Sequence, residues 1–372
     1  MKYWISLILV FWVVACSQPP KTLQEEAYAS DTIKYAQGFS VRHFPDYTSV
    51  EVRDPWDSTR LLQRYLLVDR NKSVPKALPK GTVVSVPVQN MVVYTAVHAA
   101  IIEQLGEVGR VVGVCESRYI DSPSFKEGLK KGEIVDMGEA TAPNVELMIE
   151  KGVELAFVSP FQNSGYGPVE KLGIPIIEAA DYMEALPLGR TEWIRFYGLL
   201  FGKEVVADSI FHATEKRYMD LKQLVAETPK RPTVFSEKKY GSSWFVAAGE
   251  SYVANLFKDA GADYIFKDIQ GTGSKPLAFE TVLDEAIHAD VWLVKFNLSK
   301  DMSYDDLRME YAPYENFDAF KKRNIYFCNT GKVPYYEESP LHPDYLLKDL
   351  IWIFHPELLP ADFHPRYFRK ME

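Results

Sequence analysis

The sequence contains few cysteines, and their spacing excludes several kinds of site. Its 372 residues include only three, Cys16, Cys115 and Cys328. No pair has the spacing of a zinc or redox motif. Cys115 and Cys328 stand in the apolar contexts VVGVCES and IYFCNT, in parts of the chain that we assign to different lobes. A disulfide between them would cross the two lobes, so we predict two buried, free thiols.

A surplus of positive charge is also missing. The chain has 51 acidic and 42 basic residues and a formal net charge of -9. This balance disfavours nucleic acid or an anionic surface as a partner. The sequence also lacks GxGxxG after a strand, the P-loop pattern and GxSxG, and no Ser, His and Asp suggest a triad by position. We therefore predict a protein that is not an enzyme.

The only long apolar run lies at the start of the chain. Residues 5–14 are apolar and follow Lys2, and a run of this length is too short to span a bilayer. Such a pattern is typical of a secretory signal peptide. The end of the run, Val13-Val14-Ala15-Cys16, resembles a bacterial lipobox, in which the cysteine is lipidated and becomes the mature N-terminus. We predict lipidation of Cys16, and the alternative is a plain signal peptide with a chance cysteine.

The rest of the chain is long enough for two domains with their own cores. Alternating apolar residues predict strands before residue 80, and apolar strands that alternate with helices predict parallel α/β lobes after it. The first lobe strand is predicted at residues 83–88. The expected plan is a signal peptide (1–16), a tether and β-rich N-terminal extension (17–80), an N-terminal α/β lobe (81–186), interlobe helices (187–229), and a C-terminal α/β lobe with a terminal helix (230–372).

The interlobe helices are the most regular part of the pattern. Thr191 can cap a first helix, and Gly202 interrupts it before a second helix at residues 203–225. The second helix would be roughly 33 Å long, about the width of a small domain. Its predicted apolar stripe consists of Val206, Ile210, Ala213, Leu221 and Leu224. The fold class expected is therefore two parallel-sheet α/β lobes joined by a long, rigid helix.

One unit of sequence occurs in both lobes. Residues 145–158 and 279–294 each combine an apolar residue, a glutamate, a short helix, an acidic residue and a buried strand. Glu146 and Glu280 thus occupy equivalent helix starts, one in each lobe. A helix dipole stabilises a carboxylate at such a place, which explains either residue alone. A matched pair also predicts two exposed acidic side chains on one face of the molecule.

Taken in this order, the segments resemble the class III substrate-binding proteins of ABC importers, which carry cobalamin or ferric siderophores. The resemblance covers about residues 82–356, and it depends on PNVELM with VELAFVSP, on FETVLDEAIHADVWL, on PLGRTEWIRFYGLLFGKE and on GSSWFVAAGESYVANLFKDAGADY. It implies that Glu146 and Glu280 dock into arginine pockets of an ABC permease. It also implies a monomer without a cofactor that binds a small metal chelate and is lipid-anchored in the cell envelope.

The resemblance further implies that the chelate is held between the lobes. Loops at the carboxyl ends of parallel strands would line this cleft. The residues they offer are Asn90, Tyr94, Arg118, Tyr119, Phe161, Gln162 and Tyr166 from the first lobe, and Tyr240, Trp244, Tyr252, Lys295 and Asn297 from the second. Trp244 and Tyr240 are the strongest candidates because Gly241 and two serines surround them. Arg118 could pair with carboxylates or catecholates, and the alternative for each aromatic residue is a place in the core.

Histidine is too scarce for a site that binds a free metal ion. Of the seven histidines, only His98 follows a lobe strand closely enough to face the cleft, and the alternative for it is simple packing on its helix. We therefore expect a chelated metal, with a ferric siderophore preferred over cobalamin or another corrinoid, and haem third. Two alternatives belong to other functional classes: an enzyme, and a sensor or adhesion lipoprotein built on the same scaffold.

Overall fold

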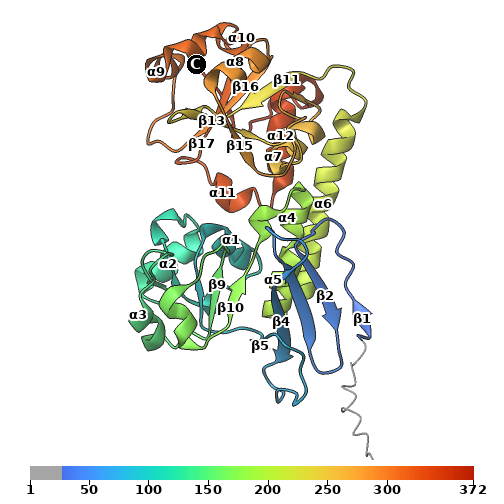
Figure 1. The fold of residues 1–372 in the computed structure, drawn as a ribbon, viewed down its shortest axis with the longest axis vertical. Helices are drawn as coiled ribbons and strands as arrows, with labels where there is room; N and C mark the ends of the chain where they lie inside the picture. Colours follow the sequence, from blue (N-terminus) through green and yellow to red (C-terminus); the bar gives the residue numbers. More distant parts are fainter. Residues whose placement is uncertain (1–26) are drawn as a thin grey trace, which may run out of the picture.

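The computed structural model describes residues 27–372, and Figure 1 shows two α/β lobes stacked along the long axis with helices joining them at one side. Lobe one, the lower in the figure, has a five-stranded parallel sheet of order β10-β9-β6-β7-β8. Its strands are β6 (Met91–Val93), β7 (Val111–Val114), β8 (Val135–Asp136), β9 (Leu155–Val158) and β10 (Ile176–Glu178), and its helices are α1 (Ala96–Gln104), α2 (Pro123–Lys131) and α3 (Val145–Glu150).

Lobe two repeats this plan with a sheet of order β14-β11-β16-β17-β18, parallel except for β18. Its strands are β11 (Thr233–Ser236), β14 (Asp263–Tyr264), β16 (Val291–Phe296), β17 (Ile325–Asn329) and β18 (Arg369–Lys370), and a smaller antiparallel sheet contains β12 (Lys239–Tyr240), β13 (Ser243–Ala247) and β15 (Ser274–Leu277). Its helices are α7 (Tyr252–Asp259), α8 (Phe279–Ala286), α9 (Tyr304–Glu310), α10 (Asp318–Lys321), α11 (Tyr335–Glu338) and α12 (Pro343–Phe354). The predicted fold class and the repeated helix–strand unit are confirmed.

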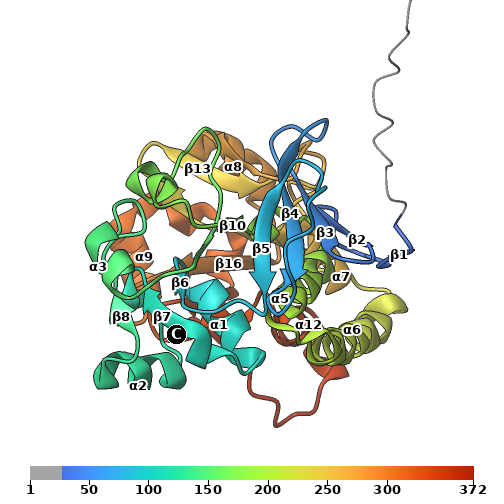
Figure 2. The same ribbon diagram turned by 90° about the horizontal axis from the view of Figure 1, so that it is seen from below.

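The N-terminal extension forms a sheet of its own. It contains β1 (Ala29–Ser30), β2 (Phe39–His43), β3 (Thr48–Arg53), β4 (Leu61–Asp69) and β5 (Thr82–Val86) in sequential order. The prediction that residues 83–88 form the first strand of lobe one is wrong, because β5 pairs in parallel with β4 of the extension. An apolar composition is expected of any strand that is buried in a parallel pair, whichever sheet the strand belongs to. The composition of residues 83–88 therefore could not show that this strand belongs to the sheet of the extension. Figure 2 shows this sheet against α5 and α6.

Three helices, which we call the spine, connect the lobes: α4 (Pro187–Glu192), α5 (Ile194–Phe201) and α6 (Glu204–Ala226). Gly202 ends α5 with φ +65°, as its position in the sequence predicted. Thr191 is not a helix cap but lies inside α4, where its hydroxyl donates to the carbonyl of Pro340 at 2.8 Å. None of the helices among residues 27–372 has both the length and the apolar character needed to cross a membrane.

The buried face of α6 lies one position from the stripe that the sequence suggested. Its buried residues are Ala207, Phe211, Thr214, Tyr218 and Val225, whereas Val206 and Leu224 are exposed. Because α6 packs on other elements along only part of its surface, apolar spacing alone could not select between two adjacent stripes. The correct stripe is set by the two lobes that the helix joins.

The two ends of α6 belong to different hydrophobic cores. Phe211 lies in a core that combines the extension, lobe one and α5, whereas Tyr218 and Val225 lie in the core of lobe two. Leu341, which precedes α12 of lobe two, returns to the core of lobe one. The lobes are therefore connected twice, through α6 and through the segment at residues 339–342.

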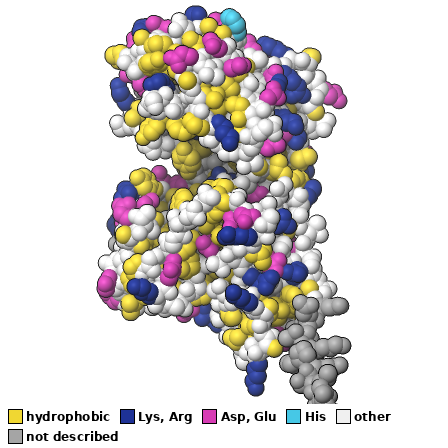
Figure 3. Space-filling view, in the orientation of Figure 1, with side chains coloured by type: hydrophobic (Ala, Val, Ile, Leu, Met, Phe, Trp, Pro, Cys, Tyr) yellow, Lys and Arg dark blue, Asp and Glu magenta, His cyan; other side chains and the backbone are white. Residues whose placement is uncertain are grey.

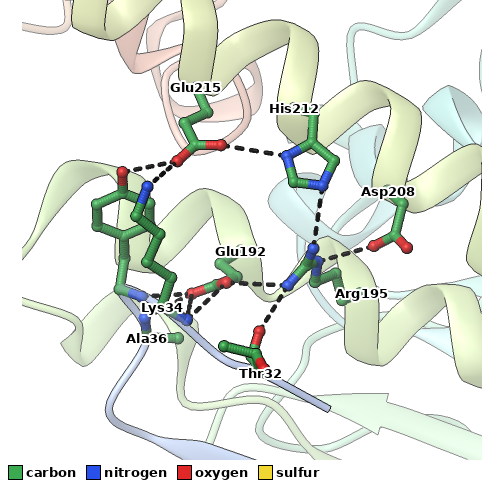
Figure 4. Close-up of polar contacts among 9 residues, drawn as sticks. Thr32, Lys34, Ala36, Glu192, Arg195, Asp208, His212 and Glu215 are labelled. Carbon is green, nitrogen blue, oxygen red and sulfur yellow. Dashed lines mark hydrogen bonds and ion pairs between the residues drawn. The ribbon is translucent and has the colours of Figure 1, made fainter.

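A buried carboxylate fixes the start of the extension to the spine (Figure 4). Glu192 is 0% exposed and accepts the backbone N–H groups of Lys34 at 2.9 Å, Tyr35 at 2.7 Å and Ala36 at 2.8 Å. The guanidinium of Arg195 lies 3.2 Å from the same carboxylate. These contacts compensate a charge that would otherwise be costly to bury.

Glu184 makes a second contact of the same type immediately downstream. Its carboxylate accepts the backbone N–H groups of Gln37 at 3.0 Å and Gly38 at 2.8 Å, and the indole N–H of Trp193 at 2.9 Å. We call Glu184 and Glu192 the carboxylate clamp. The clamp satisfies five consecutive backbone donors of a segment that has no regular structure.

Replacing Glu192 by leucine should lower the free energy of unfolding by about 3–5 kcal/mol, because the N–H groups of residues 34–36 and the charge of Arg195 would lose their buried partner. Urea unfolding followed by far-UV circular dichroism measures this change. The control is Asp220→Asn on the exposed face of α6, which should leave the midpoint unchanged. Equal effects of the two substitutions would contradict the clamp.

Both cysteines of the described residues are free and buried, as the sequence predicted. Cys115 is 1% and Cys328 0% exposed. Burial raises the pKa of each thiol to about 12, so both stay protonated at neutral pH.

In protein produced without residues 1–16, fewer than about one cysteine per ten folded molecules should react with a thiol reagent at pH 8 within minutes, whereas both cysteines should react in the unfolded protein. Absorbance with a disulfide reagent, with and without guanidinium, measures the difference. Rapid labelling of either residue in the folded state would contradict the burial.

Candidate functional site

The carboxyl ends of the two parallel sheets face each other across the gap between the lobes. Asp121, in the loop after β7, donates its backbone N–H to the carboxylate of Glu337 in α11, which follows β17, at 2.7 Å. Figure 1 shows α11 between the lobes next to α1, and Figure 3 shows the surface hollowed between them. This cleft is the candidate ligand site.

Part of the cleft is a groove with a volume of about 450 Å³. Its polar lining includes Glu103, Gln104, Asp121 and Lys126 from lobe one, and Lys332, Glu337 and His342 from lobe two. Side chains of both lobes therefore contact whatever occupies it, which is the arrangement that a two-lobed binding protein needs.

Arg118 and Tyr119 lie on the lobe-one side, in the loop after β7, and both are exposed. The guanidinium of Arg118 forms a bidentate ion pair with Glu139 at 2.6 and 3.0 Å and lies 4.7 Å from the ring centre of Tyr119. Glu139 therefore neutralises the charge of Arg118, which the sequence analysis proposed as a partner for carboxylates or catecholates of the ligand.

The loop after β9 presents Phe161, which is 65% exposed, and Gln162, which is also exposed. Tyr166 is engaged, because its hydroxyl donates to Glu178 at 2.8 Å. Tyr94 follows β6 at the correct end of the sheet but is only 5% exposed, and its hydroxyl has no hydrogen-bond partner among the described residues. Of these four residues, Phe161 and Gln162 are the ones free to contact a ligand.

Three predicted ligand residues of lobe two, Lys295, Asn297 and Tyr240, lie in β16, directly after β16 and in β12. Lys295, in β16, is paired with Glu237 at 2.6 Å and lies 5.8 Å from the ring centre of Tyr335. Burial lowers the pKa of Lys295, but the charge of Glu237, its hydrogen bond to Lys295 and the nearby Tyr335 and Tyr336 together outweigh burial, so the pKa is raised. Asn297 is exposed directly after β16, and Tyr240 is 81% exposed.

Two predicted ligand residues lie elsewhere. Asn90 precedes β6 at the amino end of the sheet, where its carbonyl accepts the N–H of Glu154 at 2.9 Å. It was placed at the wrong end because β5 was assigned to lobe one. Trp244 is 0% exposed, and its indole N–H donates to the carbonyl of Ser236 at 3.0 Å.

The burial of Trp244 has a clear local cause. The segment predicted as a loop is the hairpin β12–β13, in which alternate side chains point to opposite faces. Trp244 therefore points into the core, with its ring centre 5.7 Å from that of Trp292, whereas its neighbour Phe245 is 44% exposed.

His98 packs in the core, as the alternative interpretation held. It is 0% exposed, its ring lies edge-on to Phe157 at 4.9 Å, and its Nε2 is 3.7 Å from a carboxylate oxygen of Asp181. Within residues 27–372, no three His, Cys, Asp or Glu side chains gather in a way that could hold a metal ion.

Glu146 and Glu280 are exposed in the first turns of α3 and α8, one in each lobe. Neither makes a hydrogen bond or an ion pair with any residue of the described part of the chain. Asn144 caps α3 by accepting the N–H of Leu147 at 2.9 Å, so Glu146 is not required as a cap.

Sequence reasoning missed residues at which the spine and α11 meet the two lobes. Arg190, in α4, lies between Asp181 of lobe one and Tyr252 of lobe two, and Tyr335 and Tyr336 of α11 lie close to Lys295. Arg190 belongs to the quoted PLGR segment, but helical spacing gave no reason to separate it from other charges of the spine. Tyr252, which the sequence did propose, is half-buried there.

Trp244→Ala should lower the free energy of unfolding by about 3–5 kcal/mol, because it removes the centre of an aromatic core. Phe161→Ala should change it by less than about 0.5 kcal/mol, because the side chain is exposed. Thermal and chemical unfolding of both variants measures the difference. A stable Trp244→Ala protein would contradict the assignment of Trp244 to the core.

Comparisons with known proteins agree with this architecture. The family model described as "periplasmic binding protein" matches residues 91–330, beginning at the first residue of β6. An uncharacterized lipoprotein of Methanocaldococcus jannaschii is 30% identical over 312 residues, which cover 79% of this chain and 73% of the relative.

Two solved structures show the same fold at low identity. A periplasmic haem-binding protein from Pseudomonas aeruginosa has a TM-score of 0.58 and 16% identity over 76% of this chain and 98% of its own. An ABC-type Fe3+-hydroxamate transport system protein from Saccharomonospora viridis has a TM-score of 0.54 and 17% identity over 72% and 94%. Together with the two-lobed architecture, the family match establishes that this chain belongs to the periplasmic binding proteins, and it is a binding protein rather than an enzyme.

Proposed function

We propose that this protein captures a metal chelate, with a ferric siderophore preferred, between its lobes and delivers it to an ABC permease. The proposal places the ligand where the carboxyl ends of the two sheets meet. The observation that carries it is the pair Glu146 and Glu280, two exposed carboxylates at equivalent helix starts, one in each lobe, that have no partner among residues 27–372.

Support for the ligand comes from exposed aromatic residues in segments that follow strands of the two sheets. Phe161, Tyr240 and Tyr336 are 65%, 81% and 57% exposed, and large aromatic side chains left this exposed suit contact with a bulky ligand. The solved neighbours from P. aeruginosa and S. viridis are named for haem and for an Fe3+-hydroxamate. Iron in a chelate is already coordinated, so the protein would need no metal-ligating cluster of its own.

The paired glutamates suit a docking role for a physical reason. Arginine presents a planar fork to a carboxylate, and two such contacts, one from each lobe, would fix the orientation of the cleft over a permease. Exposed charges at the rim of an interface also accelerate association. Because no partner in the described part of the chain competes for the side chain of Glu146 or Glu280, both charges are available.

Location in the cell envelope follows from the same proposal. Cys16, the predicted lipidation site, and the tether that begins at residue 17 lie outside the described residues. The M. jannaschii relative is named as a lipoprotein, which supports an anchor of this kind. A lipid on Cys16 would hold the binding protein beside a permease in the same membrane.

Glu146→Lys combined with Glu280→Lys should lower chelate uptake by about tenfold or more, because both docking charges are reversed. Uptake of a radiolabelled ferric siderophore by cells that carry the cognate permease measures this. The same variant should bind the chelate with unchanged affinity in solution.

The matched control is Glu150→Lys combined with Glu285→Lys, two exposed residues of the same helices α3 and α8. This control should retain uptake, since it has the same change of charge at other positions. Uptake that survives reversal of Glu146 and Glu280 would contradict the docking role and favour a sensor on this scaffold.

A further inference from the structure

The connection between β4 and β5 carries a run of basic charge, and we call residues 70–81 the basic loop. Its sequence, RNKSVPKALPKG, contains no acidic residue and four basic ones: Arg70, Lys72, Lys76 and Lys80. All four are exposed, and the guanidinium of Arg70 is paired with Glu154 at 2.8 Å. None of the three lysines forms an ion pair with another residue of the described chain. The basic loop is thus a local exception in a protein whose net charge is -9.

The basic loop is fastened to the sheet of the extension. Leu78 packs in a small hydrophobic cluster with residues of β4. The carbonyl of Lys80 accepts an N–H of the Arg64 guanidinium at 3.2 Å, and Pro75 and Pro79 restrict the backbone between these points. The lysines therefore extend from a segment with a defined place on the sheet.

Strand register places the basic loop close to the point where the described chain begins. Ala29 of β1 pairs with His43 of β2. His43 pairs with Thr48 of β3, and Thr48 pairs with Leu67 near the end of β4. Since neighbouring strands lie about 4.8 Å apart, Ala29 and Leu67 are about 14 Å from each other at the same end of the sheet. Figure 1 shows this end as the lowest part of the extension, and Figure 3 shows Lys or Arg side chains there.

The same end of the sheet is the one nearest to the predicted lipid anchor. The segment between Cys16 and Tyr28 can span at most about 40 Å when fully extended. A lipid on Cys16 would therefore keep the basic loop close to the membrane. Because salt screens charges beyond about 8 Å, the lysines attract anionic lipids only when the loop lies at the membrane surface, and a tether of this length permits that position.

The composition of the basic loop suits a lipid surface better than an acidic protein surface. Val74 is 52% exposed and stands between Lys72 and Lys76. An apolar side chain flanked by cations can enter the boundary of the acyl chains while the ammonium groups stay at the headgroups. Two exposed acidic residues occur at this end of the sheet, Asp46 and Asp69, and they are fewer than the unpaired lysines.

We infer that the basic loop is a membrane-contact surface that binds the anionic headgroups of the membrane in which the lipid anchor lies. This inference rests on the envelope location given in the proposed function. The loop precedes residues 91–330, which match the family, so this surface belongs to the extension and not to the shared binding-protein fold. Each lysine contributes little, so the protein can still turn Glu146 and Glu280 toward a permease.

The test measures cosedimentation of protein produced without residues 1–16, which carries no lipid, with vesicles of phosphatidylcholine alone or mixed with phosphatidylglycerol. Wild type should bind the anionic vesicles and should be released from them by about 0.5 M NaCl, because salt screens the contact. Lys72→Gln combined with Lys76→Gln and Lys80→Gln should lower binding to the anionic vesicles by about tenfold or more.

The matched control is Lys230→Gln combined with Lys258→Gln and Lys275→Gln, three exposed lysines of lobe two. It has the same net charge as the loop variant and should bind as wild type does, and thermal unfolding midpoints show whether both variants fold. Equal losses in the two variants, or equal binding of wild type to anionic and neutral vesicles, would overturn the inference.

A protein partner would give a different result. Loss of chelate uptake in the loop variant, without binding of wild type to anionic vesicles, would overturn the membrane contact and indicate an acidic protein instead. The proposed function is tested separately, because the vesicles contain no permease. Uptake that survives reversal of Glu146 and Glu280 would contradict that function and leave the vesicle result unchanged.

Discussion

Two buried carboxylates decide how the parts of this protein are joined. Glu184 and Glu192 accept the backbone N–H groups of five consecutive residues, 34–38. These hydrogen bonds hold the chain before β2 close to the helices of the spine. Gly189 shows how close the approach is, because a Cβ built there would lie 2.9 Å from the carbonyl oxygen of Tyr35. The clamp holds the extension against α4 and α5, and Leu188 of α4 also packs in the core of lobe two.

The movement that remains is small, for a reason visible in the two cores. Helix α6 contributes Phe211 to one core and Tyr218 to the other, and Leu341 provides a second connection next to it. A hinge that opened widely would have to extract one of these buried side chains. The structure therefore fits two lobes held at nearly fixed spacing. A fixed spacing is what a pair of docking charges requires.

The predicted positions of the candidate residues were correct where they depended on local patterns and wrong where they depended on packing. The repeat of helix and strand placed Glu146 and Glu280 correctly in the first turns of α3 and α8, since helix starts follow from nearby residues. Trp244 and Asn90 were misplaced, because a hairpin face and the sheet to which a strand belongs depend on partners distant in the sequence. His98 and Arg190 have similar polar character in the sequence, yet the fold buries one against Phe157 and leaves the other between the lobes.

The sequence by itself determined the order of elements: a β-rich extension, two α/β lobes, a spine interrupted at Gly202, and two free cysteines in apolar segments. These follow from apolar periodicity and from the conformational freedom of glycine, both of which act over a few residues. Only the tertiary structure decided that β5 joins the extension, that α6 buries Phe211 and Tyr218 rather than Val206 and Leu224, and that Arg190 meets Asp181 and Tyr252. Those outcomes depend on surfaces that come together only when segments far apart in the chain pack, and no local pattern records them.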